Sequence, residues 1–169
     1  VIDTMVGLGL TLFGIKTTDL DDLLNDIKRI GEITDKELEA QALTSEMASK
    51  ITAVTDVTSE SEERPRVFYI VWHDPLWTAG SGTFIRERIE NGGGVNIGGN
   101  LTGYPTISIE EVVARNPEVI ITSSWPSVYE GAMNETALNA TDARQNGRVF
   151  ACDDNLVQRP GPRLVQGLE

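Results

Sequence analysis

The chain has 169 residues, of which 40% are hydrophobic and 6% aromatic, a composition that fits one globular domain, or one domain with an appendage. No apolar run comes near about 18 residues, so the sequence predicts no membrane-spanning helix. The formal net charge of −12 argues against nucleic acid as a partner, because no basic stripe is present to neutralise phosphates. A single cysteine excludes an internal disulfide framework and a thiolate metal cage.

The charge is unevenly distributed along the chain. Residues 1–63 hold 5 Lys/Arg against 14 Asp/Glu, whereas residues 64–169 hold 9 against 12, and all nine of those cations are arginine. The composition changes within Thr55–Arg66, a polar stretch typical of a solvated loop. We therefore predict two parts: an acidic helical segment over 1–63 and an α/β lobe over 64–169.

The first part opens with a predicted short helix over Val1–Leu8, followed by a candidate strand over Leu10–Ile15. A strand without an earlier partner suggests a piece of a longer chain. Thr18 is then expected to cap a helix whose leucines and isoleucines recur at i, i+3, i+4 and i+7, and Gly31 is expected to close it.

A long helix is predicted next. Thr34 is expected to cap it, with Glu37 three residues later as the capping-box partner. The apolar stripe continues to about Thr55, which makes roughly 21 residues or about 32 Å at 1.5 Å per residue. A helix of that length can cross a whole domain.

The second part is organised around the stretch Val67–Gly94. Six consecutive apolar residues, Val67–Trp72, predict a strand that is buried on both faces, with Trp72 in the core. Ser81 or Thr83 is expected to cap the helix that follows. In open α/β sheets, ligands bind beyond the carboxyl ends of the strands. We therefore expect function in the loop between this strand and its helix, over 73–83.

The remaining sequence continues the alternation of strands and helices. Residues 95–104 are predicted as loop, and Ser108 with Glu111 forms a capping box that opens a short helix. Further strands are predicted over Val119–Thr122 and Val149–Cys152. The predicted fold is therefore α/β: a three-layer sandwich lobe with a mostly parallel sheet, preceded by the long helix.

Aromatic residues in the predicted loops are the first candidates for ligand contact. Trp77 lies in a loop between Pro75 and Gly80, where apolar residues do not recur with the period of a helix or a strand. Trp125 follows a buried strand. Both tryptophans therefore suit stacking on a flat, partly apolar ligand. Tyr104 precedes a proline in a loop, where anchoring of the turn is as good an explanation as ligand contact. For the two tryptophans, packing against the loops is the alternative.

Two arginines flank a proline-rich stretch near the end of the chain. Arg159 and Arg163 could pair bidentately with a carboxylate or phosphate, or they could be a solvated pair at a helix start. His73 and Asp74 suggest no metal site, because metal sites need several convergent ligands and the chain has one histidine. The sequence lacks catalytic signatures, and Gly80-Ser81-Gly82 does not have the spacing of a nucleophile elbow. We therefore expect a binding protein and not an enzyme.

Four segments taken in order resemble a known family. Tyr104–Thr122, YPTISIEEVVARNPEVIIT, is similar to a signature of the substrate-binding proteins of ABC importers for iron–siderophore complexes and cobalamin. Trp77–Ile85 with Gly92-Gly93 resembles the first strand–loop–helix unit of that family's C-terminal lobe, and Leu24–Thr34 resembles its segment before the helix that joins the lobes. Arg159–Arg163 resembles a stretch near the end of many members. The resemblance implies the connecting helix plus the C-terminal lobe, without the N-terminal lobe.

The resemblance also implies a function. A cleft between two lobes captures an iron(III) chelate or a corrinoid outside the cytoplasm and delivers it to the permease, with no other cofactor. It places Glu110 where the family docks onto permease arginines, and docking is the favoured interpretation; the alternative is a carboxylate that only interacts with the helix dipole. Faces that meet the absent lobe are expected to drive self-association as a two-fold homodimer. Two alternatives stay open: a piece of an α/β enzyme whose catalytic half is missing, and a homo-oligomeric interaction domain.

Overall fold

The computed structural model describes residues 2–168, so Glu169 and Val1, the first residue of the helix predicted over Val1–Leu8, lie outside the described residues. Its centre is a four-stranded sheet with the order β2-β1-β3-β4, in which all neighbouring strands are parallel. The strands are Arg66–Ile70 (β1), Val95–Asn96 (β2), Val119–Ser123 (β3) and Val149–Cys152 (β4). Among residues 2–168, no helix combines the length and apolarity needed to cross a membrane.

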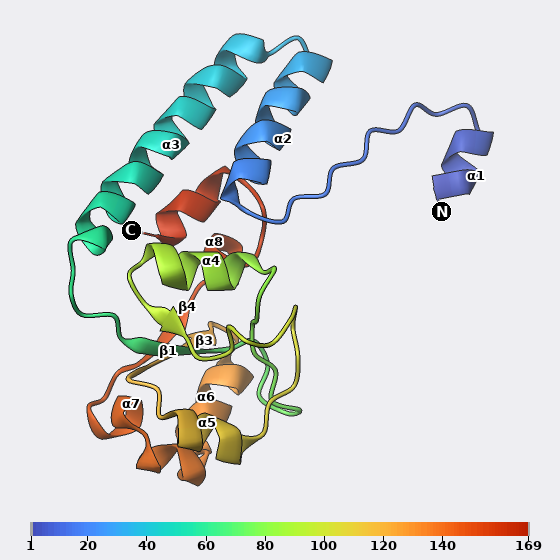
Figure 1. Ribbon diagram of the computed structural model, residues 1–169. Coiled ribbons are helices and arrows are strands. Elements are labelled where there is room, and N and C mark those ends of the chain that lie inside the picture. Colours follow the sequence, from blue (N-terminus) through green and yellow to red (C-terminus); the bar gives the residue numbers. More distant parts are fainter. Residues whose placement is uncertain (1, 169) are drawn as a thin grey trace.

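Helices cover both faces of this sheet (Figure 1), which confirms the predicted three-layer α/β sandwich. One face carries Phe84–Asn91 (α4) and Asp154–Val157 (α8), and Pro162–Gly167 (η2) packs beside α8. The opposite face carries four short helices: Ile109–Arg115 (α5), Pro126–Asn134 (α6), Thr136–Ala140 (η1) and Asp142–Gln145 (α7).

Alternate residues of each strand face the two helical layers. Phe68, Ile70 and Ile120 pack with the layer of α5, α6 and α7. Val67 and Tyr69 face the layer of α4 and α8, together with residues of β3 and β4. Because both faces are covered, the strands contain unbroken apolar runs without alternation, which is why they were recognisable in the sequence.

Strand β1 is shorter than predicted. It ends at Ile70, and the chain turns at Val71 into a loop, so Trp72 belongs to the loop and 46% of its surface is exposed. The expectation that Trp72 lies in the core is therefore wrong. Strand β2 was expected to be loop. Its two residues pair with Arg66 and Val67, and two residues are too few to show a periodic pattern.

A helical hairpin precedes the sheet, formed by Leu20–Ile33 (α2) and Glu37–Ser59 (α3). The predicted caps are wrong. Asp19, not Thr18, caps α2 by accepting from the Asp22 backbone N–H at 2.7 Å, because Thr18 instead donates to the Asp22 carboxylate. Helix α2 ends at Ile33, two residues beyond Gly31, and Thr34 is its C-cap.

Helix α3 starts after Lys36 with no side-chain cap, so the predicted capping box of Thr34 and Glu37 does not form. It has 23 residues and reaches Ser59, further than the predicted end near Thr55. Its last turn is attached to the lobe, because the Thr58 hydroxyl donates to the Asn91 carbonyl at 2.7 Å. Its middle packs through Met47 with Phe84 and the η2 residues Leu164 and Val165.

The chain before the hairpin lies away from the rest of the protein. Ile2–Gly7 (α1) stands at the end of a long extended segment (Figure 1). The predicted strand over Leu10–Ile15 is wrong, since no β-pairing of residues 2–168 includes it. Leu10, Phe13 and Ile15 are exposed there. An extended backbone becomes a strand only when a neighbouring strand supplies hydrogen bonds, and none lies next to this segment.

The hairpin depends on a close approach of its two helices at Gly31. A Cβ added at Gly31 would lie 2.5 Å from the Ala40 Cβ and 3.0 Å from the Lys36 carbonyl oxygen. Gly31→Ala should therefore destabilise the chain by about 1–3 kcal/mol through overpacking, although alanine is normally the better helix former. Urea denaturation followed by circular dichroism measures the change.

The control is the double variant Gly31→Ala/Ala40→Gly, which removes the nearest clash and should recover part of the lost stability. A single variant that is more stable than the unchanged chain would contradict this view of the hairpin.

Candidate functional site

All four strands run in the same direction, so their carboxyl ends meet at one edge of the sheet. The loops that leave this edge carry exposed aromatic side chains. They are Trp72 and Trp77 after β1, Tyr104 in the connection after β2, and Trp125 after β3. Such an edge is where open α/β sheets bind ligands.

The first loop holds its two tryptophans in a tight turn. The Val71 N–H donates to the Trp77 carbonyl and the Trp77 N–H donates to the Trp72 carbonyl, both at 2.9 Å. The Trp72 indole N–H donates to the Asp74 carbonyl at 2.9 Å. The Thr78 hydroxyl, fully buried, donates to the Tyr69 carbonyl at 2.8 Å and fixes the loop to β1. Trp77 is therefore presented by an anchored turn with 39% of its surface exposed.

The loop that carries Tyr104 lies directly beside the first. The Thr78 N–H donates to the Pro105 carbonyl at 3.0 Å and the Gly80 N–H donates to the Gly103 carbonyl at 2.8 Å. Gly80 is required for this contact, because a Cβ there would lie 2.3 Å from the Leu101 carbonyl oxygen. Burial raises the pKa of the Tyr104 phenol, so it remains a neutral hydrogen-bonding group.

A small crevice of about 250 Å³ opens between the ends of β3 and β4. Trp125 and Arg159 both line it, together with Asp153 and Asp154. Trp125 is 62% exposed, and none of the ion pairs of residues 2–168 includes Arg159. The crevice therefore presents an aromatic surface beside an accessible cation.

The Asp154 carboxylate, which lines this crevice, belongs to a hydrogen-bond network that connects the ends of β1, β3 and β4. Asp154 accepts from the Ser123 hydroxyl at 2.6 Å and from the Gln158 side-chain amide at 2.7 Å. The same amide also donates to the Tyr69 hydroxyl at 3.4 Å. Because β1, β3 and the segment after β4 meet in this network, the Asp154 side chain that lines the crevice is held in place by hydrogen bonds.

The structure brings together most, but not all, of the residues that the sequence suggested. Trp125 and Arg159 share the crevice, and Trp77 and Tyr104 lie on the two adjoining loops. Arg163 is exposed at the start of η2 and is not among the residues that line the crevice. Their contact with a ligand stays a prediction for all five.

Sequence reasoning did not place three residues at this edge: Trp72, which was expected in the core, and Asp153 and Asp154, which were interpreted as structural. Trp72 was assigned to the core because it continues an apolar run. The two aspartates follow directly after the β4 residue Cys152, and polar residues at the carboxyl end of a buried strand were a signal that could have drawn attention to them.

The chemistry available at this edge is non-covalent. Among residues 2–168, no group of three or more His, Cys, Asp and Glu side chains is arranged to hold a metal ion. The imidazole of His73 packs closely against α6, where a Cβ at Gly131 would lie 2.4 Å from its Cδ2. Exposed indole rings, a phenol and a guanidinium suit stacking and hydrogen bonding to a flat molecule.

The fold and this edge define a ligand-binding lobe of the α/β type. Residues 6–156 match the family described as periplasmic binding protein. The chain belongs to the periplasmic binding protein family, as the resemblance of its segments indicated.

Relatives from two organisms are named for cobalamin. A cobalamin-binding protein of Halobacterium salinarum is 30% identical over 168 residues, covering 94% of this chain and 45% of that protein. A vitamin B12-binding protein of Vibrio parahaemolyticus is 25% identical over 168 residues, covering 99% of this chain and 60% of that protein. The chain thus spans about half the length of the relatives it matches.

A solved structure shows the same arrangement. A possible iron-binding (periplasmic solute-binding) protein of Staphylococcus epidermidis superposes with a TM-score of 0.86 at 25% identity, covering 99% of this chain and 67% of that one. The family and the named relatives are binding proteins and not enzymes, as the missing catalytic signatures suggested.

The single cysteine provides a test of the packing under this edge. Cys152, the last residue of β4, is half-buried, and burial raises the pKa of its thiol. A raised pKa means less thiolate at pH 8, and the thiolate is the reactive form. The native chain should react with DTNB at least about tenfold more slowly than the urea-unfolded chain. The pH midpoint of the rate should also lie higher in the native chain, so an equal or lower midpoint would refute the packing.

Proposed function

We propose that this chain is the C-terminal lobe of the substrate-binding component of an ABC importer, and that its aromatic edge contacts one side of a metal chelate. The observation that carries the proposal is the presence of Trp77, Tyr104, Trp125 and Arg159 on adjoining loops at one edge of a parallel sheet. Aromatic faces bind flat, partly apolar rings, and a guanidinium pairs with carboxylate or phosphate groups on the rim of such a ligand.

The proposed ligand is a corrinoid of the cobalamin type or an iron(III)–siderophore-type complex. The relatives in two organisms that are named for cobalamin favour the corrinoid. The iron-binding description of the Staphylococcus epidermidis structure supports the iron complex as the second candidate. Either ligand is larger than the crevice, whose volume is about 250 Å³, so a second lobe is needed to enclose it.

The proposed place of action is outside the cytoplasm, with an ABC permease as partner. Membership of the periplasmic binding protein family supports this location. A relative from Bacillus subtilis, 27% identical over 165 residues, is named as an ABC transporter substrate-binding lipoprotein, which supports both the partner and an anchored full-length protein. The homodimer expected from the sequence stays a prediction.

Glu110 is the proposed docking residue for the permease. It occupies the first turn of α5 and is exposed, and no ion pair of residues 2–168 includes it. Its neighbour Glu111 pairs with Arg115, which also donates to the Asn100 side chain at 2.7 Å. Ser108 caps the helix as predicted, accepting from the Glu111 N–H at 3.2 Å. Glu111 therefore has a structural role, whereas Glu110 is available to a partner.

Cobalamin binding tests the ligand-contact residues. In a two-lobed protein that contains this chain, Trp77→Ala and Trp125→Ala should each weaken cobalamin binding by about tenfold, equivalent to about 1.4 kcal/mol of lost stacking. Absorbance titration with cobalamin and with a ferric hydroxamate measures both ligand classes in the same proteins.

The matched control is Arg64→Met, because Arg64 is exposed before β1, at the opposite edge of the sheet. This variant should leave the ligand affinity unchanged, whereas Arg159→Met and Arg163→Met should each weaken the binding of a ligand that carries carboxylates or phosphates. Residues 1–169 alone form half of a cleft and should bind weakly. Submicromolar cobalamin binding by this chain alone would exclude the two-lobed cleft.

Transport assays separate the two neighbouring glutamates. Glu110→Ala in the full-length protein should slow uptake while changing the free energy of unfolding by less than about 0.5 kcal/mol, because exposed rim charges act mainly on association. Glu111→Ala should lower stability by about 0.3–0.5 kcal/mol through loss of its i,i+4 pair. Unchanged uptake in Glu110→Ala would remove the docking assignment and leave the helix dipole as its explanation.

A further inference from the structure

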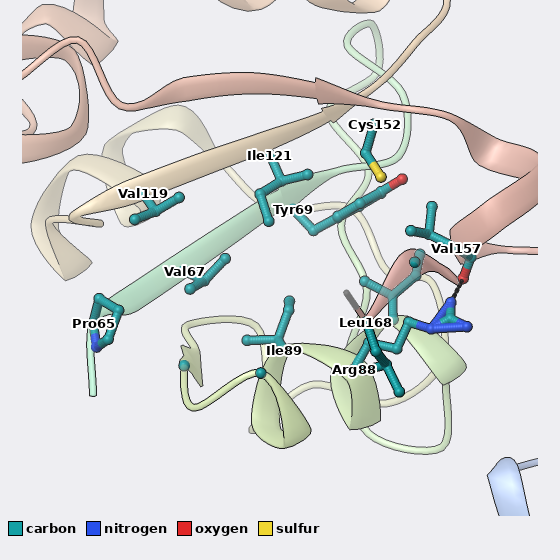
Figure 2. A pocket seen from close by; sticks show the side chains of 14 residues that line it. Pro65, Val67, Tyr69, Arg88, Ile89, Val119, Ile121, Cys152, Val157 and Leu168 are labelled. Atoms are coloured by element: carbon teal, nitrogen blue, oxygen red, sulfur yellow. Dashed lines mark hydrogen bonds between the residues drawn. The ribbon is translucent and has the colours of Figure 1, made fainter. Parts of the chain in front are cut away.

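A second cavity lies away from the aromatic edge, between the sheet and helix α4 (Figure 2). Its volume is about 310 Å³, at the lower end of the range for small-molecule pockets. Val67 from β1, Val119 and Ile121 from β3, and Ile89 from α4 line it, and Leu168 lies beside Arg88 (Figure 2). The walls are therefore mostly aliphatic side chains.

The cavity contains one buried charge. Arg88 lines it and is only 6% exposed. Its Nη1 donates to the Val157 carbonyl at 2.5 Å, drawn dashed in Figure 2, and its Nη2 donates to the Leu164 carbonyl at 2.8 Å. Its Nε is buried and has no hydrogen-bond partner. None of the ion pairs of residues 2–168 includes Arg88, so its charge meets only neutral carbonyls.

The groups around Arg88 do not supply a counter-ion. Burial lowers the pKa of Arg88 to about 10, which still leaves it positive at pH 7. Burial raises the pKa of both Tyr69 and Cys152, so neither is an anion near neutral pH. The carboxylate of Glu87, its neighbour on α4, accepts from the Leu20 backbone N–H of the hairpin at 3.0 Å. A buried charge without an opposite charge is costly, and pairing it is the usual solution.

We propose that this cavity binds a carboxylate carried on an apolar body, with the carboxylate accepting from the Nε–H of Arg88 and the body lying against Val67, Ile89 and Ile121. Nε has no partner, and a guanidinium carries five N–H groups, so one carboxylate can bind without displacing the two carbonyl bonds. A phosphate brings more negative charge than one guanidinium among aliphatic walls neutralises, so a carboxylate is the better match. This site is separate from the crevice of Trp125 and Arg159 and does not depend on the proposed transport function.

Two sources can supply this chemistry. One is a free aliphatic carboxylic acid that enters the cavity from solution. The other is an acidic side chain on an apolar segment of polypeptide. Both place an anion beside Arg88 and alkyl groups against the sheet, so they share the first experiment and differ in the second.

The first experiment titrates residues 1–169 with sodium octanoate, octan-1-ol and octylamine, following the methyl NMR signals of Val67, Ile89 and Ile121. Octanoate should bind at least about tenfold more tightly than either of the other probes. The net charge of −12 repels octanoate and attracts octylamine, so a preference for octanoate cannot come from the overall field. Octanoate binding no tighter than octan-1-ol binding overturns the proposal without requiring any variant.

The variants Arg88→Met and Arg86→Met test whether Arg88 is the group that binds the carboxylate. Both lie on α4, but Arg86 points outward and pairs with Glu90 at 2.8 Å. Arg88→Met should abolish the preference for octanoate over octan-1-ol, whereas Arg86→Met should retain it. A preference that survives in a folded Arg88→Met protein places the carboxylate elsewhere and overturns the proposal.

The second experiment distinguishes the two sources by repeating the octanoate titration on a longer, two-lobed chain that contains these residues. Octanoate binding to the longer chain identifies a free carboxylate as the natural occupant. If octanoate binds residues 1–169 but is excluded from the longer chain, and Arg88→Met destabilises that chain, the carboxylate belongs to the polypeptide. Octanoate exclusion with no effect of Arg88→Met on the longer chain overturns the assignment of an anion to this cavity.

Discussion

The parallel direction of the strands is the constraint on which the rest of the structure depends. Because each connection between parallel strands must cross the sheet, helices cover both faces, and every strand leaves the core at the same edge. The loops at that edge have no core to fill, so their aromatic side chains are free to face solvent or a ligand. The position of the candidate site therefore follows from strand direction before any particular residue is considered.

The loop edge and the cavity differ in how their charged side chains are compensated. At the edge, Asp154 receives hydrogen bonds from Ser123 and Gln158, so its charge is compensated without a ligand. In the cavity, the Nη1 and Nη2 atoms of Arg88 donate to two carbonyls and its Nε has no partner, so its charge is compensated only partly. A carboxylate held by hydrogen bonds suits a surface that accepts a ligand repeatedly, whereas a buried cation without a counter-ion favours the binding of an anion.

The sequence predicted features that are determined locally or by long apolar runs. The buried strands beginning at Val67 and Val119 were recognisable because covering both faces removes the polar alternation. The Ser108 cap was recognisable because it depends on residues three positions apart. The aromatic loop residues Trp77 and Trp125 stood out because they follow such strands.

Features that depend on distant partners could not be read in this way. The two residues of β2 are a strand only because Arg66 and Val67 lie beside them, and Leu10–Ile15 fails to be one because no strand lies beside it. The burial of Arg88 results from packing by α8 and η2, about seventy residues further along the chain. Local patterns carry no information about such contacts.

The attachment of α3 to the lobe gives the long helix a mechanical role. Thr58 bonds to the end of α4, and the 23 residues of α3 extend from that point for about 35 Å. Met47 in the middle of α3 also packs on Phe84 and Leu164, so the helix is held to the lobe at two places and moves with α4 and η2. The hairpin contact at Gly31 makes α2 move with it, so a small rotation beside the sheet becomes a shift of a whole helical pair.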